Sequence, residues 1–252
     1  MSGTLVINEI YLSLQGESTY AGLPCVFVRL TACNLRCSYC DTAYAFTQGR
    51  KVDVREIAAR VQELAGPFAG QPPVKLGASG ETAKLPLVEF TGGEPLLQPN
   101  VLPLMSNLCD RGFTVLLETS GALDISPVDP RVRRIMDLKC PSSGEADRNR
   151  WDNLPHLRAS DEIKFVIGAR EDYEWTREQI RTHRLAEKCG LLISWVHPLQ
   201  PEQRDKSLKA APPGLAPISR QELAQRIIDD ALPVRFQVQL HKIIWPPDQR
   251  GV

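Results

Sequence analysis

The sequence has no net charge and no long apolar run, and each absence excludes a class of function. Its 30 lysines and arginines balance 30 aspartates and glutamates, so it lacks the basic excess expected of a broad phosphate-binding face. No stretch approaches the roughly 20 apolar residues that span a bilayer, and Met1–Thr4 does not begin a secretory leader. We therefore expect a cytoplasmic protein that binds neither nucleic acid nor membrane directly.

The chain also lacks the cysteine pattern of a disulfide-stabilised protein. Its seven cysteines are an odd number, and three of them crowd into residues 33–40. Disulfide frameworks belong to small secreted chains with an even number of cysteines, so we expect reduced thiols. With 252 residues, 42% apolar and 24% charged, the composition is that of an ordinary globular protein.

Short apolar segments alternate with helical patterns along the chain. Each segment is 4–8 residues long, and several are nearly continuous in Val, Ile, Leu and Phe, which is typical of buried parallel strands. The predicted strands are Leu5–Leu12, Cys25–Leu30, Leu87–Phe90, Thr114–Glu118, Ile135–Leu138, Glu162–Ile167, Leu191–Val196 and Val234–Leu240. The alternation predicts an α/β protein with a parallel sheet or a barrel-like arrangement.

Helices are predicted between these strands. They cover Val54–Leu64, Val101–Arg111, Tyr173–Cys189 and a segment from Ser219 to about Leu232. Asp53 and Ser219 are the predicted N-caps, and Gly112 and Gly190 fall where a left-handed C-terminal cap is expected.

Two stretches rich in proline and glycine, 66–86 and 200–217, interrupt the alternation. Both are predicted to be variable surface loops within one domain, because neither resembles a linker between two domains. We therefore expect a single domain that spans residues 1–252.

The predicted strand Cys25–Leu30 leads into a loop with three closely spaced cysteines. Cys33, Cys37 and Cys40 have the spacing C-x3-C-x2-C, so their thiolates can converge on one centre. Thiolate is a soft ligand that suits zinc or an iron–sulfur cluster. A structural zinc site takes four ligands, and Cys140 or a histidine could supply the fourth only through the fold. Three ligands with one open metal position favour a reactive site.

This spacing, with Tyr39 just before the last cysteine, resembles the signature of the radical S-adenosylmethionine (SAM) superfamily. Residues 91–95 (TGGEP) follow the strand Leu87–Phe90 and resemble the G-G-E-P motif of that superfamily. The resemblance implies a 4Fe–4S cluster on the three cysteines, whose fourth iron is chelated by the amino and carboxylate groups of SAM. It also implies cleavage of the sulfonium by one electron, and a 5′-deoxyadenosyl radical that abstracts a hydrogen atom from the substrate.

Four further segments are similar to the 7-carboxy-7-deazaguanine synthase family within that superfamily. They are residues 8–17 (NEIYLSLQGE), 25–30 (CVFVRL), 40–42 (CDT) and the tail 237–245, which contains QLHK. The resemblance covers nearly the whole chain. It implies ring contraction of 6-carboxy-5,6,7,8-tetrahydropterin to 7-carboxy-7-deazaguanine with release of ammonia, on the route to queuosine and other deazapurines. It further implies Mg²⁺ as a cofactor, a partial, open β/α barrel and a homodimer.

The same resemblance assigns contacts with the substrate. Leu14, Gln15 and Gly16 match the substrate-binding L-Q-G segment, and a glutamine amide suits the donor and acceptor edge of a pterin. Arg29 matches the family's carboxylate-binding arginine, whose fork can hold a planar carboxylate through two charge-assisted bonds. An arginine within an apolar strand is costly unless it is paired, which favours this role.

Thr42 matches the magnesium ligand of the family. Mg²⁺ prefers oxygen ligands and takes the rest of its shell from water and substrate, so the ion should bind poorly without pterin. The alternative role for Thr42 is a helix cap or a turn. Thr91 and, in the tail, Pro247 align with further substrate contacts.

The predicted SAM contacts lie mostly at strand ends. They are Tyr39, Cys40, Asp41, Gly93, Glu94, Ser120, Asp137, Lys139 and Gln200. Gly92 and Gly93 would let the backbone approach the methionyl group because they have no Cβ, and the Glu94 carboxylate could meet its ammonium. Alternatively, this segment is only a strand-to-helix turn.

The residues leave two other functions open. A radical enzyme that places a glycyl radical on a protein partner would have the same cysteine loop, although Arg29 suits a small carboxylated heterocycle better. A zinc-binding interaction module would use the three cysteines and a distant fourth ligand. In the favoured interpretation the partners are the pterin, a reducing electron donor of the flavodoxin type and a second copy of the chain. His241 is expected to be a structural histidine.

Overall fold

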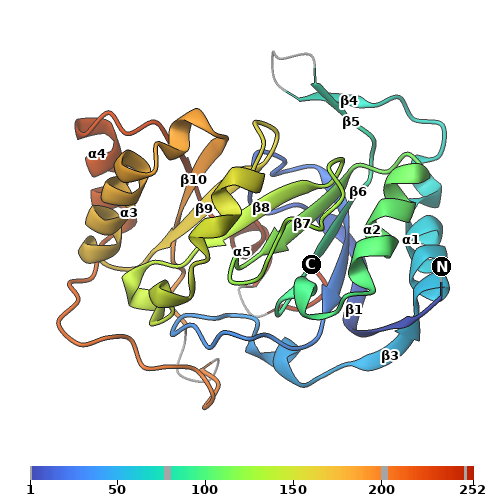
Figure 1. Cartoon of the computed structure of the whole chain (residues 1–252), viewed down its shortest axis with the longest axis horizontal. Helices are drawn as coiled ribbons and strands as arrows, with labels where there is room; N and C mark the ends of the chain where they lie inside the picture. The colour runs from blue at the N-terminus through green and yellow to red at the C-terminus, as the bar shows by residue number, and fades with distance from the viewer. Residues whose placement is uncertain (1, 77–80, 200–203, 247–248) are drawn as a thin grey trace.

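The computed structural model describes residues 2–76, 81–199, 204–246 and 249–252. Its main sheet has nine strands in the order β11-β10-β9-β8-β7-β6-β2-β1-β3 (Figure 1). The strands are β1 (Thr4–Leu14), β2 (Pro24–Leu30), β3 (Arg50–Asp53), β6 (Leu87–Gly92), β7 (Val115–Thr119), β8 (Arg133–Leu138), β9 (Glu162–Ile167), β10 (Gly190–Trp195) and β11 (Arg235–Gln237), and a separate hairpin pairs β4 (Val74–Leu76) with β5 (Glu81–Ala83).

The strands β2, β6, β7, β8, β9, β10 and β11 run parallel, whereas β1 and β3 are antiparallel to their neighbours. Since β11 and β3 stand at the two ends of the order, the sheet does not close on itself. The fold is a partial, open β/α barrel, as the resemblance to the radical SAM superfamily implied.

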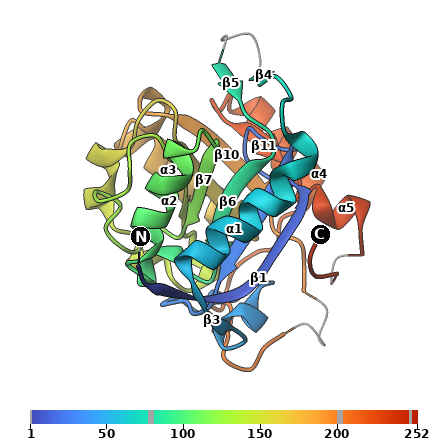
Figure 2. The ribbon, with the colours of Figure 1, turned by 90° about the vertical axis from the view of Figure 1, so that its right-hand side faces the viewer.

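Helices lie on both sides of the strands. The helices are α1 (Val54–Ala65), α2 (Val101–Asp110), α3 (Arg170–Thr182), α4 (Arg220–Asp229) and the short α5 (His241–Ile244), and short 3-10 segments cover Ala43–Phe46, Gly66–Phe68, Pro95–Leu97, Pro141–Ser143, Ala146–Arg148, Trp151–His156 and Leu185–Glu187. In Figure 2, α2 and α3 lie on one side of the sheet, and α5 lies on the other side with the C-terminal end of the chain.

Alternation along the strands gives the two faces of the sheet different surroundings. Val26 and Val28 of β2 and Phe90 of β6 point outward, into the main apolar core that includes Ile57 of α1 and Leu104 of α2. Inward-pointing side chains near the start of the parallel strands form a smaller apolar cluster, together with Tyr20 after β1 and Ala83 of β5. Its buried members are Tyr20, Cys25, Phe27, Ala83, Leu87, Leu116, Ile135 and Leu192.

Farther along the strands, the inward positions become polar. Arg29 follows Phe27 on β2, Glu89 follows Leu87 on β6, and Glu118 follows Leu116 on β7, each two residues later. Asp137 of β8 and Lys164 of β9 stand at paired positions of neighbouring strands. The apolar cluster therefore forms the floor under a polar layer at the carboxyl ends of the parallel strands.

Each of the eight predicted strands is present. The ends of the first seven lie within a few residues of the prediction, whereas the last strand is much shorter than predicted. Val234–Leu240 was predicted as one strand, but β11 covers only Arg235–Gln237. The chain leaves the sheet there because the Leu240 N–H bonds the Gly16 carbonyl at 2.9 Å and α5 begins at the next residue. The strand β3 was not predicted, because this short edge strand starts with two exposed basic residues.

The predicted helix caps are largely correct. Asp53 accepts a hydrogen bond from the Arg55 N–H at 2.8 Å, and Ser219 accepts one from the Glu222 N–H at 3.0 Å, so both are N-caps. Gly112 has a φ of +80°, as a left-handed C-terminal cap requires.

The predicted helix Tyr173–Cys189 has the wrong ends, since α3 begins at Arg170 and ends at Thr182. The Asp172 carboxylate accepts from two backbone N–H groups that precede the helix, which fixes its start. A left-handed residue, Arg184 with φ +51°, follows its end. Gly190 is the first residue of β10 and not a cap.

The two predicted surface loops differ in how they meet the rest of the molecule. Residues 66–86 carry the β4–β5 hairpin, at the top of Figure 1, which is not paired with the main sheet but packs Ala83 into the smaller apolar cluster at its floor. The segment that follows residue 203 packs instead against the cysteine loop, because the Lys209 N–H bonds the Arg36 carbonyl at 2.9 Å. It is therefore more than a surface loop.

Candidate active site

A cavity of about 920 Å³ lies at the carboxyl ends of the parallel strands. This is where α/β sheets bind ligands, and the volume is in the range of small-molecule sites. Its walls come from the cysteine loop, residues 14–17 after β1, the ends of β6 to β9, and parts of the chain after residue 203, including the tail 249–252.

The three cysteines of the loop share this cavity. Cys33, Cys37 and Cys40 all line it, and none of them is in a disulfide. Burial raises the pKa of each thiol, that of Cys40 to about 12, so the thiols are neutral without a bound metal. Among the described residues, no three or more His, Cys, Asp or Glu side chains form a group that could hold a metal ion.

The cysteine loop is fixed to the segment that follows β8. The Ser38 N–H bonds the Ser143 carbonyl at 3.0 Å, and the Ser38 hydroxyl donates to the Ser142 carbonyl at 2.6 Å. The Arg36 N–H bonds the Glu145 carboxylate at 2.6 Å. The loop therefore presents its thiols from a hydrogen-bonded frame.

The two glycines after β6 allow this strand end to touch the cysteine loop. A Cβ on Gly93 would lie 1.9 Å from the Ala32 carbonyl oxygen, and one on Gly92, whose φ is +134°, would lie 2.2 Å from the Leu30 oxygen. Neither position can hold a side chain. The glycines thus let the end of β6 lie against the end of β2 and the start of the cysteine loop. Both also line the cavity, and the approach of a methionyl group to them stays a prediction.

Glu94 is turned away from the cavity. Its carboxylate is fully buried and accepts from the Thr119 hydroxyl at 2.9 Å, from the Ser120 N–H at 2.8 Å and from the Ser120 hydroxyl at 2.6 Å. It also caps the following turn through the Leu96 N–H. These bonds join the ends of β6 and β7, and the contact of this carboxylate with an ammonium group stays a prediction.

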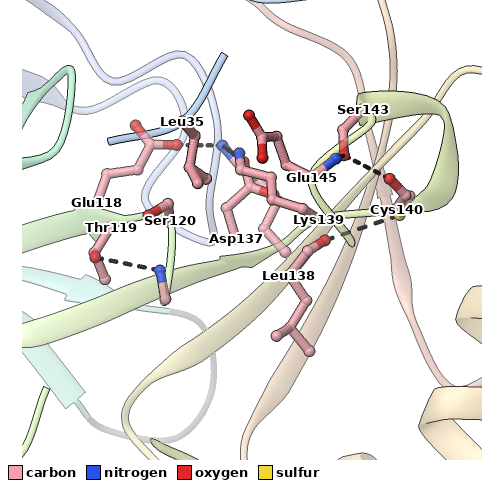
Figure 3. Close-up of polar contacts among 12 residues, drawn as sticks. Leu35, Glu118, Thr119, Ser120, Asp137, Leu138, Lys139, Cys140, Ser143 and Glu145 are labelled. Atoms are coloured by element: carbon pink, nitrogen blue, oxygen red, sulfur yellow. Dashed lines mark hydrogen bonds and ion pairs between the residues drawn. The ribbon is translucent and has the colours of Figure 1, made fainter. Parts of the chain in front are cut away.

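Among the described residues that line the cavity, two buried polar atoms have no hydrogen-bond partner. They are Oδ1 of Asp137 and the hydroxyl of Tyr39, and both residues line the cavity. The other Asp137 oxygen accepts from Lys139 Nζ at 2.8 Å, as Figure 3 shows beside Glu118 and Ser120. Orphaned buried polar atoms are costly, so they mark a place for a polar ligand next to the thiols.

Residues 14–17 are held against the C-terminal tail. Leu240 bonds the Gly16 carbonyl, and Gln239 Nε2 donates to Glu17 Oε1 at 3.2 Å. A Cβ on Gly16 would lie 2.4 Å from Nδ1 of His241, so glycine is required there. The tail thus closes one side of the cavity, and His241 both packs against Gly16 and lines the cavity.

Arg29 is paired, as its place in an apolar strand required. Its Nε donates to Glu9 Oε1 at 2.8 Å, and Nη2 donates to the Tyr11 hydroxyl at 2.9 Å. The Tyr44 hydroxyl donates to the same Glu9 oxygen at 2.8 Å. These contacts orient the guanidinium, and Arg29 lines the cavity.

A group that we call the carboxyl cluster, made of Glu17, Glu89, Glu118 and Lys164, lines another part of the same cavity. Lys164 Nζ lies 3.1 Å from Glu17 Oε2, in contact with Glu118 Oε1, and 3.9 Å from Asp137 Oδ2. Glu89 instead accepts from the neutral amide of Gln15 at 2.9 Å. One lysine therefore serves three carboxylates, and Glu89 is left out.

The carboxyl cluster separates two glutamates by their pKa. Burial alone would raise the pKa of Glu17, but Lys164 holds it below the usual value. Burial and the nearby Glu118 raise the pKa of Glu89 to about 8. Glu17 is therefore ionised near neutral pH, whereas Glu89 is protonated.

Thr42 lies beside an ion pair that joins the cysteine loop to the tail. Lys242 Nζ contacts Asp41 Oδ2, and the Thr42 hydroxyl donates to Asp41 Oδ1 at 2.9 Å. The hydroxyl proton is thus committed to Asp41. The oxygen lone pairs of Thr42, which lines the cavity, remain for a cation.

The structure brings most of the predicted site residues to this cavity. Those that line it are Leu14, Gln15, Gly16, Arg29, Cys33, Cys37, Tyr39, Cys40, Asp41, Thr42, Thr91, Gly93, Ser120, Asp137 and Lys139. Glu94 lies behind the wall, and the predicted residues Gln200 and Pro247 lie outside the described residues.

The residues that the sequence interpretation missed are mainly those of the carboxyl cluster. Glu89 lies in the run Leu87–Phe90 and Lys164 in Glu162–Ile167, where a charge interrupts an otherwise apolar strand. The same signal drew attention to Arg29, so it could have identified both residues, although not the groups that they face.

Comparisons with known proteins agree with this site. The radical SAM superfamily matches residues 28–142. The chain is 45% identical to the 7-carboxy-7-deazaguanine synthase of Koribacter versatilis, over 98% of this chain and 99% of that protein, and 39% identical to the one of Chlorobaculum tepidum, over 98% and 97%. A crystal structure of QueE from Escherichia coli is similar in fold, with a TM-score of 0.66, 19% identity, and coverage of 94% of this chain and 95% of that one. Across the described residues, we find no helix of the length and apolar character needed to cross a membrane.

Proposed function

The chain belongs to the 7-carboxy-7-deazaguanine synthase family of radical SAM enzymes, and from this premise we propose the reaction that its cavity performs. The enzyme contracts the ring of 6-carboxy-5,6,7,8-tetrahydropterin to 7-carboxy-7-deazaguanine with release of ammonia, on the route to queuosine and other deazapurines. It is therefore a carbon–nitrogen lyase. The observation that carries the proposal is the single cavity in which three free thiols face a carboxyl-rich end.

The thiol end fits a 4Fe–4S cluster. Cys33, Cys37 and Cys40 supply three soft ligands and leave one iron open for SAM. The cluster and SAM, when bound, supply one-electron cleavage and abstraction of a hydrogen atom. Lys139, which favours the ionised form of each of these thiols, helps the loop to bear the charge of three thiolates.

The polar atoms around the thiols fit SAM. The unpartnered oxygen of Asp137 and the hydroxyl of Tyr39 would meet its polar groups, with Asp41, Gly93, Ser120 and Lys139 along the same wall. Cys40 lies between Tyr39 and Asp41 and belongs to the same surface. Glu94, whose bonds join β6 and β7, stays a predicted contact behind Ser120. Gln200 stays a prediction.

The pterin carboxylate fits Arg29. Glu9 and Tyr11 hold two of its nitrogens, and the guanidinium faces the cavity with donors left for a carboxylate. Residues 14–16 and Thr91 border the same space and would contact the ring. Pro247 stays a prediction.

Thr42 fits a weak magnesium site. A lone hydroxyl oxygen is a poor site by itself, so we propose that Mg²⁺ binds with the pterin, through Thr42, substrate oxygens and water. The hydrogen bond to Asp41 supports this role because it leaves the lone pairs of the hydroxyl free for the ion.

The remaining proposals concern the setting of the enzyme. We propose that the whole chain forms one domain, works as a homodimer in the cytoplasm, and receives its electrons from a reducing carrier of the flavodoxin type. Light scattering of the purified protein measures the assembly, and reduction of the cluster by a purified flavodoxin tests the donor.

One experiment tests the reaction. The protein is reconstituted with iron and sulfide without oxygen and incubated with SAM, a reductant, Mg²⁺ and 6-carboxy-5,6,7,8-tetrahydropterin. We expect a brown protein with about four irons per chain, and 7-carboxy-7-deazaguanine in the mass spectrum. A colourless zinc protein that makes no product would refute the proposal and favour an interaction module.

A further inference from the structure

Glu89 is a buried carboxyl group in the wall of the substrate cavity. It lies on β6, is 1% exposed, and pairs across the sheet with Phe27 of β2 and Leu116 of β7. The titratable and charged groups that face it come from every neighbouring element: Tyr11 of β1, Glu17 after β1, Cys25 of β2, Glu118 of β7 and Lys164 of β9.

These neighbours do not offer Glu89 a free cation. Lys164 is held by Glu17 and Glu118, and Arg29, on the adjacent strand, is held by Glu9. The hydrogen-bond partner of Glu89 among the described side chains is the neutral amide of Gln15. An ionised Glu89 would face two other carboxylates in a buried site, so the neutral acid is favoured at neutral pH.

The hydrogen bonds around Glu89 show where its proton can point. Gln15 Nε2 donates to Glu89 Oε2 at 2.9 Å, and Gln15 Oε1 accepts from the Glu17 N–H at 2.6 Å, which fixes the orientation of the amide. The second oxygen of Glu89, Oε1, has no partner in the part of the chain that the structure describes. A hydroxyl on Oε1 can therefore donate into the cavity that Glu89 lines.

We propose that Glu89 contacts the substrate as a neutral carboxylic acid, with its Oε1 hydroxyl donating a hydrogen bond to the 4-carbonyl oxygen of the pterin ring. This inference rests on the proposed function. Glu17 and Glu118, as carboxylates, can only accept hydrogen bonds and so suit the N–H groups of the ring. The ring carbonyl needs a donor, and Glu89 supplies one at this end of the cavity.

The proposal makes Glu89 a determinant of specificity. A 4-amino analogue presents N–H donors where the substrate presents its carbonyl oxygen, so the Glu89 hydroxyl would lose its acceptor. A buried polar group left unpaired in this way costs enough to reject an analogue strongly. Wild-type protein should therefore prefer the 4-oxo over the 4-amino form of the same ligand.

The test measures binding of a ligand that does not react. 6-Carboxypterin is fluorescent, so its affinity can be titrated by fluorescence in reconstituted wild-type protein, Glu89→Gln and Glu89→Ala, below and above pH 8. Glutamine copies the shape of the neutral acid and keeps an N–H donor without titrating. The ligand ring itself titrates, so part of the pH dependence of binding comes from the ligand. Glu89→Gln measures that part alone.

We expect wild-type protein to lose about tenfold more affinity than Glu89→Gln when the pH rises through the Glu89 pKa. Glu89→Ala should bind about tenfold more weakly at low pH and should lose the preference for 6-carboxypterin over its 4-amino analogue. Glu63→Gln, which changes an exposed glutamate of α1, should match wild type throughout.

Three outcomes would overturn the inference. They are an equal loss with pH in wild type and Glu89→Gln, a weak Glu89→Gln at low pH, and an unchanged ligand preference in Glu89→Ala. If these occur while wild-type protein still makes 7-carboxy-7-deazaguanine, the inference about Glu89 alone fails. If wild-type protein neither binds 6-carboxypterin nor makes the product, the proposed function fails with it.

Discussion

The two parts of the cavity wall that carry the thiols and the carboxyl cluster, its thiol end and its carboxyl end, are built in different ways. At the thiol end, the three cysteines lie within Cys33–Cys40, eight consecutive residues of one loop, and burial keeps the thiols neutral. At the carboxyl end, Glu89, Glu118 and Lys164 come from three separate strands, and the lysine is already paired with Glu17 and Glu118. The thiols are thus uncharged before a ligand enters, whereas the carboxyl end already holds a lysine between two carboxylates.

This difference suits the two kinds of ligand. A loop can place three sulfurs around a cluster through its own turns, and here bonds from Ser38 hold it to the segment after β8. A flat heterocycle needs donors and acceptors at fixed spacing, which side chains on neighbouring strands provide with little freedom to move. We therefore expect changes at the thiol end to abolish cluster binding, and changes at the carboxyl end to alter stability and substrate affinity.

The largest effect is expected at the thiol end. Cys37→Ser should abolish cluster assembly and reductive cleavage of SAM, because two thiolates leave the cluster without its third ligand. Iron content and the release of 5′-deoxyadenosine measure the two losses. Cys109→Ser changes a half-buried cysteine of α2 that is absent from the cavity, and it should keep about four irons per chain. Full iron content in Cys37→Ser would show that the loop does not hold the cluster.

At the carboxyl end, Lys164→Met should mainly destabilise the fold. It leaves the Glu17 and Glu118 carboxylates without their shared cation in a buried site, which costs about 3 kcal/mol. Urea unfolding of the protein without cluster measures the change. Lys164→Met combined with Glu118→Gln removes one of the stranded charges, so the double variant should be more stable than the single one. Equal stability in wild type and Lys164→Met would mean that this lysine does not stabilise the carboxylates of Glu17 and Glu118.

The same comparison explains how far the sequence could predict the site. The cysteines and residues 91–95 were recognisable because each motif is contiguous, and β2 and β6 because their apolar runs are buried. The partner of a charged strand residue has no such local sign, since Gln15 and Glu89 are 74 residues apart. Glu94 shows the same limit: its motif was correctly identified, but its role depends on Ser120, which lies beyond another strand.

A smaller effect is expected at Arg29, on the β2 wall of the cavity. Arg29→Lys keeps the charge but loses the fork that can hold a carboxylate with two parallel bonds, so kcat/KM for the pterin should fall about tenfold to a hundredfold. Iron content and cleavage of SAM without pterin should stay at the wild-type level, which separates this variant from Cys37→Ser. Unchanged pterin kinetics would contradict the role of Arg29 in binding the carboxylate.

The smallest effect is expected at Thr42, which is bonded to Asp41 beside the ion pair between Asp41 and Lys242 of the tail. Its hydroxyl supplies one ligand of a magnesium shell that is otherwise made of substrate and water oxygens. Thr42→Ala should therefore weaken Mg²⁺ binding by about 1 kcal/mol, which raises the Mg²⁺ concentration needed for half-maximal turnover several-fold. Thr42→Ser keeps the oxygen and its bond to Asp41 and should stay near wild type. Binding of Mn²⁺ to the protein with 6-carboxypterin, followed by electron paramagnetic resonance, gives a second measurement that does not depend on turnover. Lys242 lies in the tail and forms an ion pair that orients Asp41. Lys242→Met should therefore raise the Mg²⁺ requirement as well, but less than Thr42→Ala. An identical response to Mg²⁺ in Thr42→Ala and wild type would leave Thr42 as a turn residue, and the pterin would then hold the ion without help from this loop.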